Sequence, residues 1–165
     1  MMPDYLTDNE IHALLQEAKP LPADYQRRLV TRPKRGHNEV QLDVQGASGS
    51  AFRVILRQSL TNPLDFSVIL GYCPPNSNQV VRLRRYNGKS HEHTNPLEHE
   101  TFYDFHIHQA TERYQPSGNR EDTFAERTNR YADMRQAVEC LIADCAMQLP
   151  PEANMPLFGP TEQPT

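Results

Sequence analysis

Apolar and polar residues alternate with period two through the middle of the chain, which predicts β-strands that turn one face toward a core. Val40, Leu42 and Val44 alternate with polar residues, and a second alternating segment follows a glycine-containing turn at 46–49. Asn87-Gly88 is a strong turn signal after a later strand. The pattern predicts five strands, over residues 39–45, 52–57, 65–70, 80–86 and 102–108.

Helical spacing replaces this alternation near both ends of the chain. Thr7 and Glu10 have the spacing of a capping box, and the apolar residues after them predict a helix over residues 8–18. Asp133 is placed to cap a second helix, whose apolar residues form one stripe before Pro150-Pro151. The stripe consists of Met134, Ala137, Val138, Leu141, Ile142 and Cys145.

These elements predict an α+β fold, a five-stranded antiparallel meander sheet with the N-terminal and the C-terminal helix packed on one face. We divide the chain into residues 1–38 (N-terminal helix and basic arm), an α+β core domain over 39–149, and a disordered Pro-rich tail over 150–165. The basic segment from Arg27 to His37 is expected to be a linker or an irregular arm. Residues 115–130 are polar and are expected to form a long loop.

Composition narrows the class of protein. The chain has 165 residues, 37% of them hydrophobic, which suits one domain with one core. Its net charge of −4 argues against binding nucleic acid by bulk charge alone, although basic residues cluster locally. No apolar run is long enough to span a bilayer, and no signal peptide is apparent. With three cysteines and no Cys-x-x-Cys pair, we expect a reduced, cytoplasmic protein that does not bind membranes.

Candidate chemistry concentrates in one segment, because five of the seven histidines fall between His91 and His108. His91 and His93 lie in a predicted loop. His106 and His108 lie on the last predicted strand, where a spacing of two directs both imidazoles to the same face. Imidazole titrates close to neutral pH, so such a cluster suits acid–base or metal chemistry.

Arginines are predicted on the outer face of the sheet, away from the helices. If the apolar positions of each strand face the helices, Arg82, Arg84 and Tyr86 point outward, beside His106 and His108. Planar guanidinium groups suit phosphate oxygens, so we expect phosphate binding on this face and just after the last strand. The candidate phosphate-binding residues are Arg53, Arg57, Arg82, Arg84 and Arg113.

Several interpretations of the histidines stay open, the simplest being a solvated loop and sheet face. Cleavage of RNA through its own 2′-hydroxyl needs a base, an acid and cationic stabilisation, and it needs neither a metal nor another cofactor. The candidate catalytic residues for it are His91, His93, His106, His108 and Tyr114.

Metal binding and binding without catalysis are the alternatives. His91, His93 and Glu98 have the spacing of a first cupin motif, but no histidine follows His108 to form the second. A non-catalytic interaction protein, such as a partner-binding or anti-defence factor, would use the same histidines and arginines as contact residues. The oligomeric state is left open.

The segments 85–95, 105–108 and 110–114 resemble a small bacterial family without an assigned activity. More loosely, they are similar to TumE-type toxins of toxin–antitoxin pairs, which carry an Arg/aromatic/Asn turn before a Phe-led strand of closely spaced histidines. This resemblance implies RNA as the substrate and a cognate antitoxin as the partner. The leading hypothesis from the sequence is therefore a small metal-independent endoribonuclease of toxin type.

Overall fold

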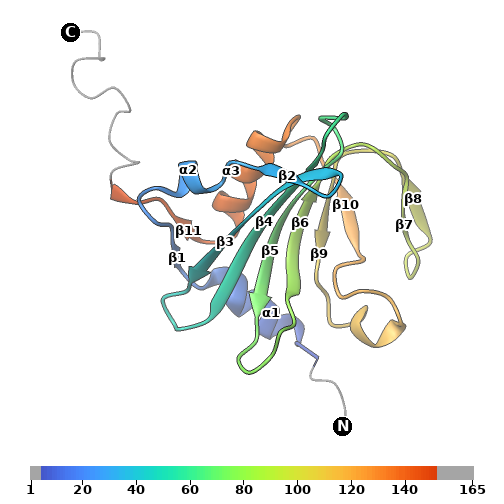
Figure 1. Ribbon diagram of the computed structural model, residues 1–165. Coiled ribbons are helices and arrows are strands. Elements are labelled where there is room, and N and C mark those ends of the chain that lie inside the picture. The colour runs from blue at the N-terminus through green and yellow to red at the C-terminus, as the bar shows by residue number, and fades with distance from the viewer. Residues whose placement is uncertain (1–4, 152–165) are drawn as a thin grey trace, which may run out of the picture.

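In the computed structural model, which describes residues 5–151, a seven-stranded antiparallel sheet has helices against one face (Figure 1). The strand order across the sheet is β10-β9-β6-β5-β4-β3-β2. These strands are β2 (Arg32–Lys34), β3 (His37–Gln45), β4 (Ala51–Ser59), β5 (Phe66–Cys73), β6 (Val81–Asn87), β9 (His106–Gln109) and β10 (Ala125–Arg127). The helices are α1 (Asp8–Gln16), α2 (Tyr25–Arg28), the 3₁₀-helix η1 (Gln115–Ser117) and α3 (Met134–Asp144).

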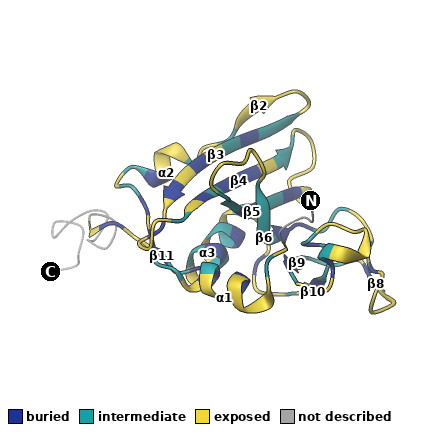
Figure 2. Cartoon of the chain, turned by 90° about the horizontal axis from the view of Figure 1, so that it is seen from below, coloured by how far each residue is buried: buried dark blue, intermediate teal, exposed yellow. Residues whose placement is uncertain are grey.

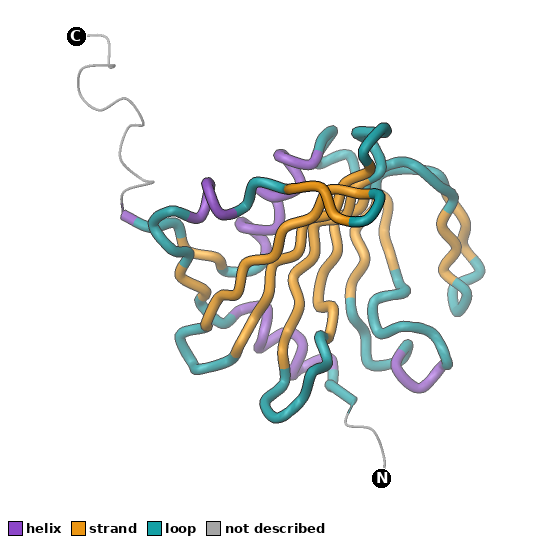
Figure 3. Tube along the Cα trace, in the orientation of Figure 1, coloured by secondary structure: helices purple, strands orange, loops and turns teal. Residues whose placement is uncertain are grey.

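Two small strand pairs stand outside this sheet (Figure 3). β1 (Lys19–Pro20) and β11 (Met147–Gln148) pair in parallel, and β7 (His93–Asn95) forms a hairpin with β8 (Glu100–Phe102). Within residues 5–151, no helix combines the length and the apolar character needed to cross a membrane. Most of the predicted Pro-rich tail, residues 152–165, lies outside the described residues.

The α+β class predicted from the sequence is confirmed, but the sheet has seven strands rather than five. β2 comes from the basic segment expected to be a linker, and Pro33 is tolerated there because an edge strand leaves half of its N–H groups unpaired. β10 comes from the expected loop over 115–130. The expected strand 102–108 is divided, because Phe102 ends β8 and β9 begins at His106.

The core lies between the sheet and the helices. Leu42, Val54 and Val68 come from neighbouring strands and are each at most 2% exposed. They belong to one apolar cluster with Ile11 of α1 and Leu141 of α3. Figure 2 shows buried residues recurring along β3 and β4, while the edge strand β2 is exposed.

The helix starts predicted from the sequence are confirmed, and a buried lysine joins the helix ends. The capping box at Thr7 and Glu10 is present, and the Asp133 side chain caps α3. Lys19 is fully buried, and its ammonium group donates to four backbone carbonyls rather than to a carboxylate. These carbonyls belong to Leu14, Leu15, Glu17 and Cys145. Lys19 therefore ties the end of α1 to the end of α3.

A β-bulge in β6 decides which arginines lie on the outer face, the face turned away from the helices. Leu70 of β5 pairs with Arg84, whereas its neighbour Gly71 pairs with Arg82, so Leu83 is an extra residue in β6. The extra residue shifts the alternation of side chains between the two faces, so positions before and after the bulge no longer follow one period of two. A simple period of two along β6 therefore assigns the wrong face to half of the strand.

The prediction that Arg84 and Tyr86 point outward is wrong for this reason. The Tyr86 hydroxyl donates to Asp144 of α3, and Arg84 lies near the same carboxylate on the helix side. Arg85 takes the outward position instead, directly opposite His108 of β9.

Candidate functional site

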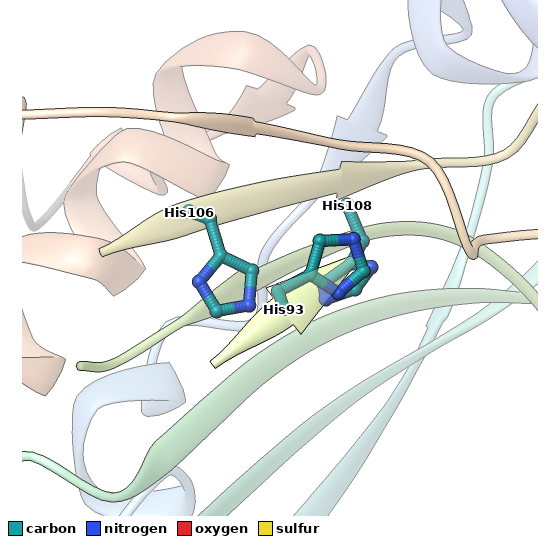
Figure 4. Close-up of side chains that lie close together, drawn as sticks. All are labelled: His93, His106 and His108. Atoms are coloured by element: carbon teal, nitrogen blue, oxygen red, sulfur yellow. The ribbon is translucent and has the colours of Figure 1, made fainter. Parts of the chain in front are cut away.

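The structure brings three of the predicted histidines together where the β7–β8 hairpin meets β9 (Figure 4). His106 and His108 project from one face of β9, as predicted, and His93 approaches them from β7. Their ring centroids are 4.8, 4.9 and 5.2 Å apart. One nitrogen from each ring lies within 4.8 Å of those of the other two. We call His93, His106 and His108 the histidine cluster.

Backbone carbonyls hold the two histidines of β9 in one tautomer. His106 Nδ1 lies 2.7 Å from the Asp104 carbonyl oxygen, and His108 Nδ1 lies 2.7 Å from the Asp122 carbonyl oxygen. Because a carbonyl only accepts, each Nδ1 carries the proton and each Nε2 carries a lone pair. Both Nε2 atoms are buried and have no hydrogen-bond partner among the described residues.

Asn95 fixes the third histidine in a similar way. Its Nδ2 donates to the Ala125 carbonyl at 2.8 Å, and its Oδ1 accepts from the Ala125 N–H at 2.9 Å, which sets the orientation of the amide. The same Oδ1 lies 2.7 Å from His93 Nε2, which must therefore donate. The lone pair of His93 is then on Nδ1. Asn95 also ties the β7–β8 hairpin to the edge strand β10.

Burial keeps the cluster uncharged. It lowers the pKa of all three imidazoles, to about 4 for His106 and to about 2 for His108. The positive charge of Arg85 lowers them further. At pH 7 the three rings are neutral, which is the form in which imidazole binds a metal ion.

Arg85 and Asp122 border the cluster. Arg85 Nε donates to Asp122 Oδ2 at 2.9 Å, and Asp122 is fully buried. The carbonyl of Asp122 is the acceptor for His108, so one residue positions both a histidine and an arginine. Asp122 Oδ1 has no hydrogen-bond partner among the described residues.

Two of the predicted phosphate-binding arginines lie elsewhere on the outer face and are paired. Arg53 Nε donates to Asp43 at 2.7 Å, and Arg57 Nε donates to Glu39 at 2.9 Å. Arg57 and His106 are aligned in register but separated by three strand spacings, or about 14 Å. Neither arginine is beside the histidine cluster.

Tyr114, Arg113 and His91 are placed around the cluster without joining it. The Tyr114 hydroxyl donates to Glu98 and accepts from the Leu97 N–H, so it is engaged by the β7–β8 turn. Arg113 forms an ion pair with the same Glu98. His91 is exposed, and its ring centroid lies 5.9 Å from that of His106.

Arg85, Asn95 and Asp122 belong to the site but were not predicted from the sequence. Asn95 had a local signal, since it lies two residues after His93 and therefore on the same face of a strand. Asp122 had no local signal in the sequence, because it lies in a polar segment whose position relative to His108 is set only by the folded chain.

Chemically, this arrangement offers three neutral nitrogen ligands with fixed tautomers beside a guanidinium group. No protein-family model, curated protein or solved structure was found to match the chain. The interpretation of the site therefore depends on its own geometry.

Proposed function

We propose that this protein binds a divalent transition metal, with zinc as the best fit, through His93, His106 and His108. The observation that carries the proposal is the pair of buried, unpartnered Nε2 atoms of His106 and His108, near a third imidazole. A buried nitrogen without a hydrogen bond is unfavourable unless a ligand satisfies it. The hydrogen bonds on the opposite ring nitrogens are the partners that metal-ligating histidines commonly have.

The distances suit a metal site that closes slightly around its ion. A tetrahedral zinc site with Zn–N bonds of about 2.1 Å holds its nitrogens about 3.4 Å apart. One nitrogen from each ring lies within 4.8 Å of those of the other two, so the rings would have to move toward one another to complete the site. Three protein ligands leave a fourth position, which is the arrangement of catalytic rather than structural zinc sites.

Metal-independent acid–base catalysis, the leading hypothesis from the sequence, fits these rings less well. It needs one imidazole that is protonated near neutral pH and can act as the acid. His106 and His108 have pKa values lowered to about 4 and about 2, so neither supplies that proton, and the acid would have to be another residue such as the exposed His91. RNA-directed activity stays a prediction, and a metal ion held by the three histidines would supply Lewis-acid polarisation of a phosphate group there.

The test is metal binding by the purified, metal-free protein. We expect one Zn²⁺ or Co²⁺ per chain, measured by calorimetry and elemental analysis. His106→Ala and His108→Ala should each weaken affinity more than about 100-fold, since each removes a direct ligand. His12→Ala is the matched control, because His12 is exposed on α1.

Circular dichroism of each metal-free variant shows whether the fold is kept. The proposal is wrong if the folded wild-type protein binds no stoichiometric metal, or if both cluster variants bind it as tightly as the His12 control. A cognate antitoxin or another protein partner also stays a prediction, to be tested by co-purification.

A further inference from the structure

Arg85 lies directly beside the histidine cluster and is only partly engaged. It is opposite His108 across the β6–β9 pair, and its side chain is 18% exposed. Nε donates to Asp122, whereas within residues 5–151 the two terminal nitrogens make no hydrogen bond to a protein acceptor. Those two nitrogens form an edge of the guanidinium group that pairs with two oxygens of an anion.

Arg82 supplies a second cation on the same outer face. It is half-buried, and no carboxylate among the described residues lies within ion-pair distance of its side chain. Burial lowers the pKa of Arg82, and the nearby charges of Arg120, Arg85 and Arg57 lower it further. Asp122 is the strongest of the nearby charges and raises the pKa of Arg82, but it is already paired with Arg85, and the Glu121 carboxylate accepts from the backbone N–H of Arg82 rather than from its side chain. A half-buried guanidinium group without a carboxylate partner of its own is unfavourable unless an anion binds to it.

Asp122 connects Arg85 to the histidine cluster. Its carbonyl accepts from His108, and its carboxylate accepts from Arg85. The guanidinium group and the histidine nitrogen are thus held by the same fully buried residue. Their relative position is fixed by the fold before any ligand arrives.

We propose that Arg85 and Arg82 form an anion subsite that holds a phosphate group against the fourth position of the metal centre. The phosphate is inorganic phosphate or part of a phosphate ester. This inference rests on the proposed function and names the class of ligand that the centre takes. A guanidinium group beside a divalent ion is unfavourable by itself, because the two cations repel each other. A phosphate between them removes that repulsion, since its negatively charged oxygens contact both the metal and the arginines.

Phosphate suits this subsite better than a carboxylate does. A phosphate monoester carries up to two negative charges and three terminal oxygens, directed to different sides of the phosphorus. A carboxylate has one charge and two oxygens that lie in one plane with its carbon, whereas the terminal oxygens of a monoester or a diester are arranged tetrahedrally and can reach a metal ion and arginines on different sides. The open edge of Arg85 also matches the bidentate geometry of phosphate recognition.

The experiment titrates the Co²⁺-loaded full chain with inorganic phosphate, p-nitrophenyl phosphate, bis(p-nitrophenyl) phosphate and acetate. The visible absorption of Co²⁺ changes when a ligand enters its coordination sphere. We expect phosphate and at least one ester to change the spectrum, and acetate to bind at least about tenfold more weakly. Tighter binding of the diester than of inorganic phosphate would identify a polynucleotide-type ligand, and the reverse order would identify free phosphate or a monoester.

Two variants separate the subsite from the metal centre. Arg85→Lys keeps a charge beside Asp122 but loses the two-nitrogen edge, and Arg82→Gln removes a charge. Each should weaken phosphate binding about tenfold to a hundredfold, because charge-assisted hydrogen bonds are lost. Co²⁺ affinity without phosphate should be equal or higher in Arg82→Gln, since a repelling cation is gone. Arg135→Gln, on the exposed side of α3, is the control and should change neither the phosphate affinity nor the Co²⁺ affinity.

The possible failures are distinguishable. If Co²⁺ binds but phosphate leaves its spectrum unchanged, or binds the variants as tightly as wild type, the anion subsite is wrong and the metal centre stands. If Co²⁺ does not bind, the metal centre is wrong and the subsite falls with it. Equal phosphate affinity with and without Co²⁺, measured by calorimetry, would overturn the bridging position.

Discussion

Asn95→Ala should weaken metal binding without touching a ligand. Asn95 is fully buried, and its Oδ1 accepts from His93 Nε2. Its amide also makes both hydrogen bonds to the backbone of Ala125, which is fully buried. Removing the amide frees the His93 ring to rotate and to change tautomer, and it detaches the β7–β8 hairpin from β10.

The expected magnitudes follow from these contacts. Loss of an outer partner of a metal-ligating histidine typically weakens metal affinity about 10- to 100-fold. The N–H and the carbonyl of Ala125 would each lose a partner, and an unsatisfied buried group costs about 1–3 kcal/mol. We therefore expect the free energy of unfolding of the metal-free protein to fall by about 2–4 kcal/mol.

Asn95→Asp separates the two effects. An aspartate keeps an acceptor for His93 and for the Ala125 N–H, but it cannot donate to the Ala125 carbonyl and it faces Glu100. It should retain metal affinity within about tenfold while losing stability. Competition with a chelator of known affinity measures the first quantity, and urea unfolding measures the second.

Thr94→Ala on the same hairpin is the control, since Thr94 is exposed and, within the part of the chain that the structure describes, its hydroxyl bonds only to that of Thr101. Folded Asn95→Ala protein that bound Zn²⁺ as tightly as wild type would contradict this prediction. In that case His93 would not be a ligand that Asn95 holds in place.

Three further predictions concern ionisation and buried charge. In the metal-free protein, His106 and His108 should stay neutral from pH 8 to pH 5, because burial lowers their pKa values. NMR chemical shifts of these two imidazoles measure this, and a titration near pH 6.5 would contradict the prediction. Burial raises the pKa of Glu39, but hydrogen bonds, that from His37 first, lower it to about 2, below its unfolded value. Ionised Glu39 thus contributes on the order of 2–3 kcal/mol to the free energy of unfolding above pH 4.5, and this contribution is lost as the pH falls toward 2. Glu39→Gln should flatten this part of the pH dependence, measured by urea unfolding. Lys19→Met should lower the free energy of unfolding by about 3 kcal/mol, because four carbonyls lose a charged donor. A change below about 1 kcal/mol would show that water replaces the ammonium group as the donor to these carbonyls.

The parts of the fold that depend on local pattern could be predicted from the sequence. Alternation placed Leu42 and Val54 toward the core and Arg53 and Arg57 on the outer face, because β3 and β4 pair without interruption. The bulge at Leu83 had no such signal, since one extra residue leaves the composition of a strand unchanged. The edge strands β2 and β10 are three residues each, too short to show a period.

The candidate site could likewise be predicted from the sequence only in part. The shared face of His106 and His108 follows from their spacing of two on one strand. The approach of His93 depends on Asn95 and Ala125, which are 30 residues apart and meet only in the folded chain. Asp122 likewise reaches His108 across 14 residues of irregular chain. Contacts between distant segments leave no periodic trace in a single sequence.

The electrostatics of the cluster bear on its two chemical interpretations in opposite ways. Burial lowers the pKa of His106 to about 4 and that of His108 to about 2, so both are protonated in only a small fraction of molecules at pH 7. That rarity makes them poor acids, but it also means that a metal ion displaces almost no protons when it binds their lone pairs. Arg85 disfavours both a proton and a metal ion, since it repels any cation placed beside it. The Asp122 carboxylate offsets part of this charge at Nε, but within residues 5–151 the two terminal nitrogens of Arg85 make no hydrogen bond to a protein acceptor. An anion bound to them would remove the remaining repulsion, which is why the proposed metal centre and phosphate subsite are more consistent together than the metal centre is alone.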